Sequence, residues 1–281
     1  MGGTGGTGGT ASTGTGGAGE TGRTHDGRGR LGNLLSGLVV AVGCVLFLGG
    51  FVWGAVVYQP YTVPTDSMSP TIAAGDRVLA ERIDGDAVRR GDIVVFRDAQ
   101  WGDMPMVKRV VGVGGDTIAC CGEGGRLTVN GKAIAEPYLR TTGAASNSFT
   151  AAVPQGQLFL LGDERSGSLD SRVHLQDPGQ GSVPRSAVTA RLDAVAWPLD
   201  GGLLERPEGF AALPGGVSGL GPVKLVVGSV VAGALLIFVG AAYGPVARVL
   251  SKSRRGTGGG GAGIGKGGAG GGSGKAAAGV G

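Results

Sequence analysis

The sequence predicts a mostly β domain that lies between two transmembrane helices and is anchored by them to a membrane. Two long stretches, residues 34–57 and 225–243, contain no charged side chain. Between them, residues 59–222 carry short apolar runs separated by Gly-Asp and Asn-Gly turn signals. Both ends of the chain are rich in glycine. We therefore expect one folded domain, two membrane spans and two tails.

The tails are too poor in apolar side chains to form a core. Residues 1–30 consist mostly of Gly, Thr and Ala, and residues 256–281 mostly of Gly and Ala. Such segments bury too little apolar surface to offset the entropy that is lost on ordering. We expect a disordered Gly-rich tail at residues 1–30 and a tail that is first basic and then Gly-rich at residues 244–281.

The first span is expected at residues 34–57, where 24 residues carry no charge. About 20 apolar residues suffice to cross a bilayer. A buried helix of a soluble protein would show a polar face, and this stretch has none. A cleavable signal peptide would have an apolar region of only about 7–15 residues and a small-x-small cleavage site. This stretch is longer and runs on into Val-Val-Tyr-Gln-Pro-Tyr, so an uncleaved anchor is expected.

The second span is expected at residues 225–243, between Lys224 and Pro245. Basic residues flank the outer ends of both spans, namely Arg23, Arg28, Arg30, Arg248, Lys252, Arg254 and Arg255. Because cytoplasmic flanks carry an excess of Lys and Arg, both termini are expected in the cytoplasm. Residues 59–222 are then the extracytoplasmic domain of a plasma-membrane protein, and their number is large enough for one core.

The pattern of residues 59–222 is typical of a β domain with many turns. Short runs rich in Val, Ile, Leu and Phe recur, and none has a convincing helical length. Asn130-Gly131 is a strong hairpin signal between two such runs. Three further runs follow Gly-Asp pairs, which lie at residues 75–76, 91–92 and 115–116.

Composition argues against a nucleic-acid partner and against a zinc site. The net charge is +4, and the basic residues form no single stripe that would suit nucleic acid. Cys44 lies in the first span and is expected to act there as a small apolar residue. Cys120 and Cys121 are adjacent, so a strained disulfide or an incidental role is expected. The cysteine spacing gives no zinc site, and no metal is expected.

Ser67 lies in Thr-Val-Pro-Thr-Asp-Ser-Met-Ser-Pro-Thr, shortly after the first span. Pro64 and Pro70 restrict the backbone on either side of it, so its hydroxyl can be held in one direction, as a nucleophile requires. A serine also needs a base. The chain has two histidines, His25 in the tail and His174, so a Ser-His-Asp triad would have to use His174.

Lys108 is the stronger candidate for the base. Residues 106–111 are predicted to be a strand, which places Met106, Lys108 and Val110 on one face and Arg109 on the other. If that face points inward, desolvation lowers the pKa of the amine. A free lysine is neutral in roughly one molecule in 2,500 at pH 7, and a lowering of its pKa by about three would make it a working base. The alternative is an ordinary solvated lysine on a strand.

Three motifs in order resemble those of the bacterial type I signal peptidases. They are Pro-Thr-Asp-Ser-Met-Ser-Pro-Thr around Ser67, Val-Lys-Arg-Val-Val-Gly-Val-Gly-Gly-Asp around Lys108, and Gly-Asp-Glu-Arg-Ser-Gly-Ser-Leu-Asp-Ser-Arg at residues 162–172. The resemblance runs from about residue 61 to residue 197. It implies a membrane-anchored serine endopeptidase of mostly β fold with a Ser/Lys dyad.

The resemblance also implies a role for each matching residue. Ser67 matches the nucleophile and Lys108 the general base, while the Ser67 backbone N–H and the Thr65 hydroxyl match the two oxyanion donors. Ser168 matches a serine that hydrogen-bonds and orients the lysine amine. The residues expected to support the site through a carboxylate–guanidinium pair are Asp163, Asp170 and Arg172. Thr65 departs from the usual serine, Glu164 from asparagine and Gly114 from proline.

The resemblance implies that the substrates are preproteins bearing signal peptides, cut after a small-x-small motif such as Ala-x-Ala, and that no cofactor is needed. Two alternatives stay open from the sequence. The self-cleaving SOS repressors share a similar dyad, but they are cytosolic and carry a DNA-binding region. A catalytically silent membrane-anchored domain that binds peptides or acts as a scaffold is the other; it has less need to keep both Ser67 and Lys108.

Overall fold

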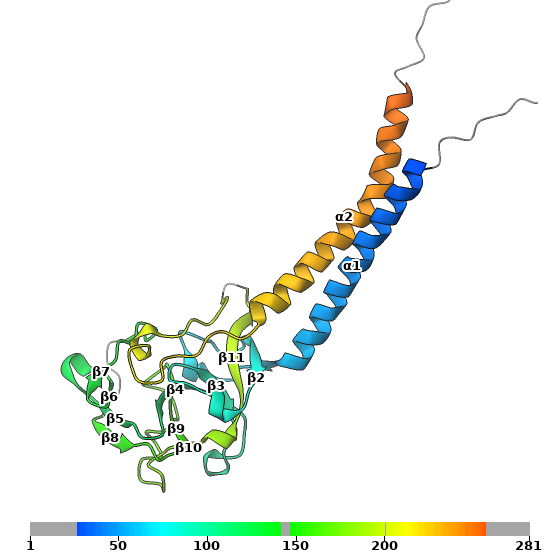
Figure 1. Ribbon diagram of the computed structural model, residues 1–281. Helices are drawn as coiled ribbons and strands as arrows, with labels where there is room; N and C mark the ends of the chain where they lie inside the picture. Colours follow the sequence, from blue (N-terminus) through cyan, green and yellow to red (C-terminus); the bar gives the residue numbers. More distant parts are fainter. Residues whose placement is uncertain (1–26, 142–146, 200, 257–281) are drawn as a thin grey trace, which may run out of the picture. The chain divides into compact units, whose positions relative to one another are not determined.

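The computed structural model describes residues 27–141, 147–199 and 201–256. Within these residues the chain forms two long helices and two antiparallel sheets (Figure 1). The mostly β domain flanked by two apolar helices that the sequence predicted is confirmed. The predicted tails fall largely on residues 1–26 and 257–281, which lie outside the described residues.

Helix α1 covers Gly27–Val57 and helix α2 covers Val223–Gly256. Each contains a stretch long and apolar enough to cross a membrane, Gly32–Val57 and Val223–Gly244. The α2 backbone stays helical through Pro245, although the sequence placed this proline beyond the end of the span. Residues 246–250, Val-Ala-Arg-Val-Leu, contain no further helix breaker, so the helix resumes after the single backbone hydrogen bond that a proline removes.

The two helices pack closely through small residues. A Cβ atom on Gly233 would collide with the backbone of Phe47, and one on Gly54 would lie 2.9 Å from a Val226 methyl carbon. Small residues let helix backbones approach in this way, which is a common means of pairing helices in membranes.

Sheet A has seven strands in the order β1-β2-β11-β3-β4-β9-β10. Every neighbouring pair in it is antiparallel. Its strands are β1 Tyr58–Thr62, β2 Arg77–Arg82, β3 Ile93–Phe96, β4 Met106–Val113, β9 Gln157–Leu161, β10 Val183–Pro184 and β11 Val188–Trp197. Strand β4 lies between β3 and β9, inside the sheet.

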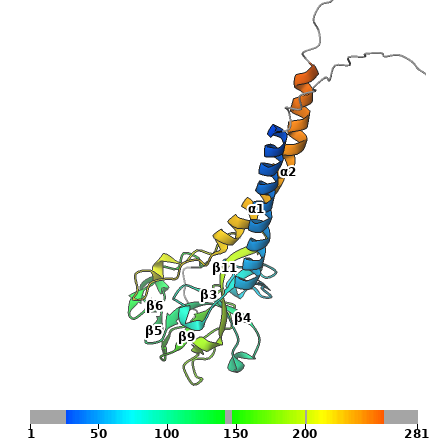
Figure 2. The same cartoon turned by 45° about the vertical axis from the view of Figure 1, so that its right-hand side comes forward.

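Sheet B has four strands in the order β7-β6-β5-β8, and Figures 1 and 2 both place β5 and β6 apart from β11. Its strands are β5 Thr117–Cys120, β6 Thr128–Val129, β7 Lys132–Ala133 and β8 Phe149–Ala152. Asn130 and Gly131 join β6 to β7 with φ angles of 54° and 78°, as the predicted hairpin requires. Cys120 and Cys121 are joined as a disulfide at the end of β5.

The joint between α1 and β1 is short and well held. Helix α1 ends at Val57 and β1 begins at Tyr58, with no residue between them. The Arg82 guanidinium on β2 donates to the carbonyl oxygens of Ala55, Val56 and Tyr58, at 3.0, 2.7 and 2.9 Å. These bonds satisfy carbonyls that the end of a helix leaves without a partner.

Candidate active site

Ser67 sits in a single 3₁₀ turn, Asp66–Met68, that follows β1. Contacts of Asp66, Ser67 and Met68 hold this turn in place. The Met68 side chain is fully buried in the core of sheet A, and the Asp66 carboxylate accepts a hydrogen bond from Ala74 N at 2.9 Å. The carbonyl oxygen of Ser67 accepts from Glu164 N at 3.1 Å. The serine is therefore fixed by its neighbours, as the bracketing prolines suggested.

Lys108 lies in β4, where cross-strand pairing sets it opposite Val94. Its side chain is 3 % exposed, and Nζ donates a hydrogen bond to Ser67 Oγ at 2.8 Å. The structure therefore brings together the two residues that the sequence singled out, although they are 41 positions apart in the chain.

Burial is the main influence on the Lys108 amine. It lowers the pKa of Lys108 from 10.5 to about 8, while the negative charges of Asp170 and Asp163 act in the opposite direction. At this pKa roughly one amine in ten is neutral at pH 7. The amine is thus far better placed to accept a proton than a solvated lysine would be.

Thr65 lies beside Ser67 and presents its hydroxyl to the same place. Thr65 Oγ1 donates to Ser67 Oγ at 3.3 Å. A hydroxyl within reach of the serine oxygen can also reach the oxygen of a carbonyl that the serine attacks, which is the geometry of an oxyanion donor. The methyl group that distinguishes threonine from serine has not moved the hydroxyl away.

The segment at residues 162–172 packs against Ser67. A Cβ atom on Gly162 would collide with the Ser168 hydroxyl and come within 2.5 Å of the Ser67 carbonyl oxygen, so only glycine fits here. The Ser168 hydroxyl is buried and has no hydrogen-bond partner among the described residues. The hydrogen bond to Lys108 that the resemblance implied is therefore not formed in this structure.

The expected carboxylate–guanidinium support divides into two separate pairs. Arg172 donates to both oxygens of Asp170 at 2.8 Å, as expected. Asp163 pairs instead with Arg109, which donates from Nε to Oδ1 at 2.8 Å and from Nη2 to Oδ2 at 2.6 Å. Thr71 Oγ1 also donates to Asp163, at 2.5 Å.

Sequence reasoning gave Arg109 no role beyond pointing away from Lys108. The signal was present, because the strand alternation that turned Lys108 toward Ser67 turns Arg109 toward the other face. Thr71, Glu136 and Tyr138 were missed altogether. Thr71 is the last residue of the motif around Ser67, but no local pattern shows its hydrogen bond to Asp163. Glu136 and Tyr138 lie in a connecting segment whose path no local pattern predicts.

His174 takes no part in this arrangement. Its Nδ1 lies 2.7 Å from Asp177 Oδ2, and its ring stacks on Trp101 with 4.6 Å between ring centroids. These contacts hold the histidine among its own neighbours, so they do not favour a Ser-His-Asp triad.

A serine hydroxyl against a buried amine, on a β domain with two apolar helices, defines a class of serine peptidases. Residues 33–197 match the family model described as "Signal peptidase, peptidase S26". The match covers more than half of the chain. The chain therefore belongs to the signal peptidase family.

Two relatives known by sequence agree with this assignment. The chain is 32 % identical to a probable signal peptidase I of Mycobacterium leprae, over 57 % of this chain and 74 % of that protein. It is 36 % identical to signal peptidase I of Bacillus caldolyticus, over 51 % of this chain and 81 % of that protein. A solved signal peptidase I from Enterococcus faecalis is 27 % identical, with a TM-score of 0.31, over 37 % of this chain and 95 % of that one.

The activity follows from the family. Signal peptidase I removes N-terminal signal peptides from exported preproteins, and it is a serine peptidase anchored in a membrane. Nothing in these similarities favours the catalytically silent scaffold.

Proposed function

We propose that Ser67 and Lys108 are the catalytic dyad of this signal peptidase. The observation that carries the proposal is the 2.8 Å contact between Ser67 Oγ and the buried Lys108 Nζ. An activated serine needs a base within hydrogen-bond reach, and this amine meets that requirement.

The proposed reaction has two steps, acylation of Ser67 and hydrolysis of the acyl ester. Neutral Lys108 takes the proton of Ser67 Oγ as the oxygen attacks the scissile carbonyl carbon. The resulting ammonium returns that proton to the leaving amine nitrogen, the peptide bond breaks and an acyl ester remains on Ser67. Lys108 next takes a proton from water, whose oxygen attacks the ester, and the proton finally returns to Ser67.

Thr65 and the Ser67 backbone N–H are the proposed oxyanion donors. Support comes from the 3.3 Å separation between the Thr65 and Ser67 hydroxyl oxygens. On substrate binding the Thr65 hydroxyl turns from the serine oxygen to the developing oxyanion, which strengthens the bond when charge builds up.

Ser168, Asp163, Asp170 and Arg172 are proposed to support the site. The buried Ser168 hydroxyl has no hydrogen-bond partner among the described residues, so its lone pairs and its proton are free for the lysine amine. The two carboxylates are held by guanidinium groups, so neither is available to pair with Lys108.

The membrane arrangement is also part of the proposal. We propose that α1 and α2 both span the cytoplasmic membrane, with both termini in the cytoplasm and residues 59–222 outside. The two apolar stretches and their basic flanks support this topology. A signal peptide lies in the same bilayer, so its cleavage site emerges near the domain.

The test is cleavage of one exported precursor by the full-length protein in liposomes, with N-terminal sequencing of the product. We expect a single cut after a small-x-small motif, and no cut by Ser67→Ala. His174→Ala is the matched control and should cleave normally. Cleavage by Ser67→Ala, or its loss in His174→Ala, would contradict the proposed dyad.

A further inference from the structure

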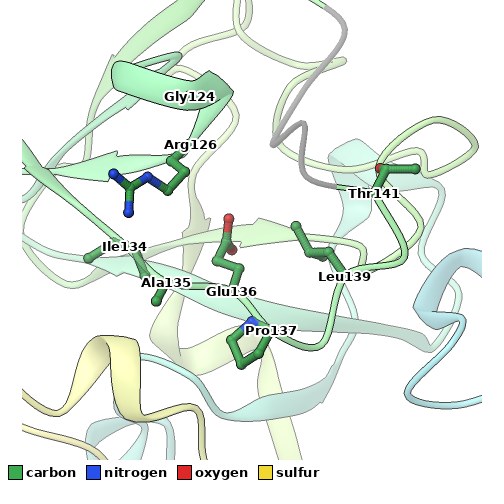
Figure 3. A pocket seen from close by; sticks show the side chains of 8 residues that line it. All are labelled: Gly124, Arg126, Ile134, Ala135, Glu136, Pro137, Leu139 and Thr141. Carbon is green, nitrogen blue, oxygen red and sulfur yellow. The ribbon is translucent and has the colours of Figure 1, made fainter.

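A short segment that follows β7 of sheet B reaches strand β4 and the loop at residues 162–172 from outside the site described above. Strand β7 ends at Ala133, and residues 134–139 then pass across the domain. Figure 3 shows Glu136 rising from this segment between Arg126 and Leu139, in a pocket of about 360 Å³. The Glu136 side chain is nevertheless only 5 % exposed, so its carboxylate must be paired.

Glu136 pairs with the loop at residues 162–172. Its two oxygens accept from the Arg165 guanidinium at 2.5 and 3.1 Å. Arg165 Nε in turn donates to the Gly162 carbonyl at 3.0 Å, and the Arg165 carbonyl accepts from Arg172 at 2.8 Å. Through Arg165, the Glu136 carboxylate therefore stabilises both ends of the loop that packs on Ser67, at Gly162 and at Arg172.

Tyr138 pairs with the strand that carries Lys108. Its hydroxyl donates to Glu136 Oε1 at 2.6 Å, and the centroid of its ring lies 4.0 Å from the Arg109 guanidinium carbon. Arg109 is the residue after Lys108 and holds Asp163 with two hydrogen bonds. Tyr138 therefore connects the β4 strand to the same brace.

The buried charges around this segment balance in pairs. Arg109 faces Asp163 and Arg165 faces Glu136, and all four groups are nearly closed to water. If the Glu136 charge is lost, the attraction of Asp163 remains, because the charge of Asp163 also acts on the Arg165 guanidinium. Arg165 would then compete with Arg109, and the loop that contacts Ser67 would move.

We propose that Glu136 and Tyr138 are positioning residues for peptide hydrolysis, which act through Arg165 and Arg109 to hold the 162–172 loop and β4 around the Ser67–Lys108 pair. Neither residue touches the reacting atoms. The inference rests on the proposed dyad. It gives sheet B a part in catalysis, because this sheet supplies the segment.

The test is steady-state kinetics of full-length Glu136→Gln in detergent, with a peptide substrate that spans a cleavage site. We expect kcat to fall between about 10- and 100-fold, since misplacement of about 1 Å has effects of this size. KM should change less than kcat does, because the hydrogen bonds of Glu136 join it to Arg165 and Tyr138 and not to Ser67 or Lys108. The alkaline rise of kcat/KM should also move to higher pH, as water gains access to Lys108.

Three further variants sharpen the test. Glu81→Gln is the matched control: Glu81 pairs with Arg191 at 2.5 Å in a similar setting but away from the loop, so its kcat and pH profile should stay unchanged. Tyr138→Phe keeps the ring on Arg109 and should lose less activity than Tyr138→Leu. Glu136→Asp keeps the charge and provides a folded variant if Glu136→Gln is unstable.

The outcomes are separable. Unchanged kcat and an unchanged pH profile per folded molecule in the Glu136 variants would overturn the inference, and so would a loss that only follows the folded fraction. A Ser67→Ala variant that still cleaves would instead overturn the dyad. An inactive Ser67→Ala beside a normal Glu136→Gln would leave the dyad intact and remove only the positioning role.

Discussion

Lys108 and Arg109 are neighbours on β4, and both are almost fully buried, with 3 % and 1 % of their surface exposed. Their surroundings differ. Arg109 meets Asp163 in a two-bond pair, whereas Lys108 meets a serine hydroxyl. Burial lowers the pKa of both groups, but the charge and hydrogen bonds of Asp163 outweigh it for Arg109, whose pKa rises, while the pKa of Lys108 falls to about 8.

This difference explains how one strand can carry a permanent cation, Arg109, beside the proposed base, Lys108. A buried carboxylate fixes the charge of Arg109 and makes it structural. Lys108 stays chemically available because Asp163 and Asp170, the carboxylates near it, are each held by a guanidinium group. Because Arg109 and Arg172 hold these two carboxylates, neither carboxylate forms an ion pair with Lys108.

The largest effect is expected when the side chain of Lys108, the proposed base, is replaced. Lys108→Ala should reduce kcat/KM by at least about 1,000-fold while the protein stays folded, because loss of either member of such a unit removes most of its catalysis. Lys108→Arg should be equally inactive, since a guanidinium cannot accept a proton near neutral pH. Precursor cleavage and circular dichroism would measure the two effects, and an active Lys108→Arg would contradict the base assignment.

The opposite test removes the partner of Arg109. Asp163→Ala should destabilise the domain by about 3–5 kcal/mol, because it leaves a buried guanidinium uncompensated. Chemical denaturation of the full-length protein in detergent would measure this loss. Arg109→Met with Asp163→Leu removes both charges and should recover part of the stability; no recovery would mean that the pair matters through its shape rather than its charge.

A smaller effect is expected from substitution of Thr65, the proposed oxyanion donor. Thr65→Ala should lower kcat about 100-fold, which is the cost of one oxyanion-hole donor. Thr65→Ser keeps the hydroxyl and should stay within about threefold of the parent. Equal kcat values for Thr65→Ala and the parent would exclude the hydroxyl from the reaction.

The sequence predicted the two apolar helices and the β class of the domain, and its resemblance to a known family pointed to Ser67 and Lys108, which lie in contact. Alternation along residues 106–111 placed Lys108 and Arg109 on opposite faces, which agrees with their separate partners. It could not predict that Asp163 would choose Arg109, because that contact joins residues 54 positions apart. The role of Glu136 could not be predicted because a connecting segment leaves no periodic signal.

The smallest expected effect is a pH dependence. As the proposed base, Lys108 must be neutral to accept a proton, so kcat/KM should rise about tenfold between pH 7 and a plateau above the pKa of about 8. Stability should follow the same sign: the unfolded lysine holds its proton up to about pH 10.5, so stability increases with pH between about 8 and 10.5. A flat kcat/KM profile over pH 6–10 would exclude a titrating base.

Helix α1 passes directly into β1, and Arg82 hydrogen-bonds the last carbonyl groups of the helix, so this junction has no flexible linker. Such a junction fixes the distance between the end of the helix and Ser67. If α1 crosses the membrane as proposed, we expect Ser67 to be held at a fixed height above the lipid, and bonds that emerge near that height to be cut. Glycines inserted after Val57 would then move the cut along the precursor, which N-terminal sequencing of the product would reveal.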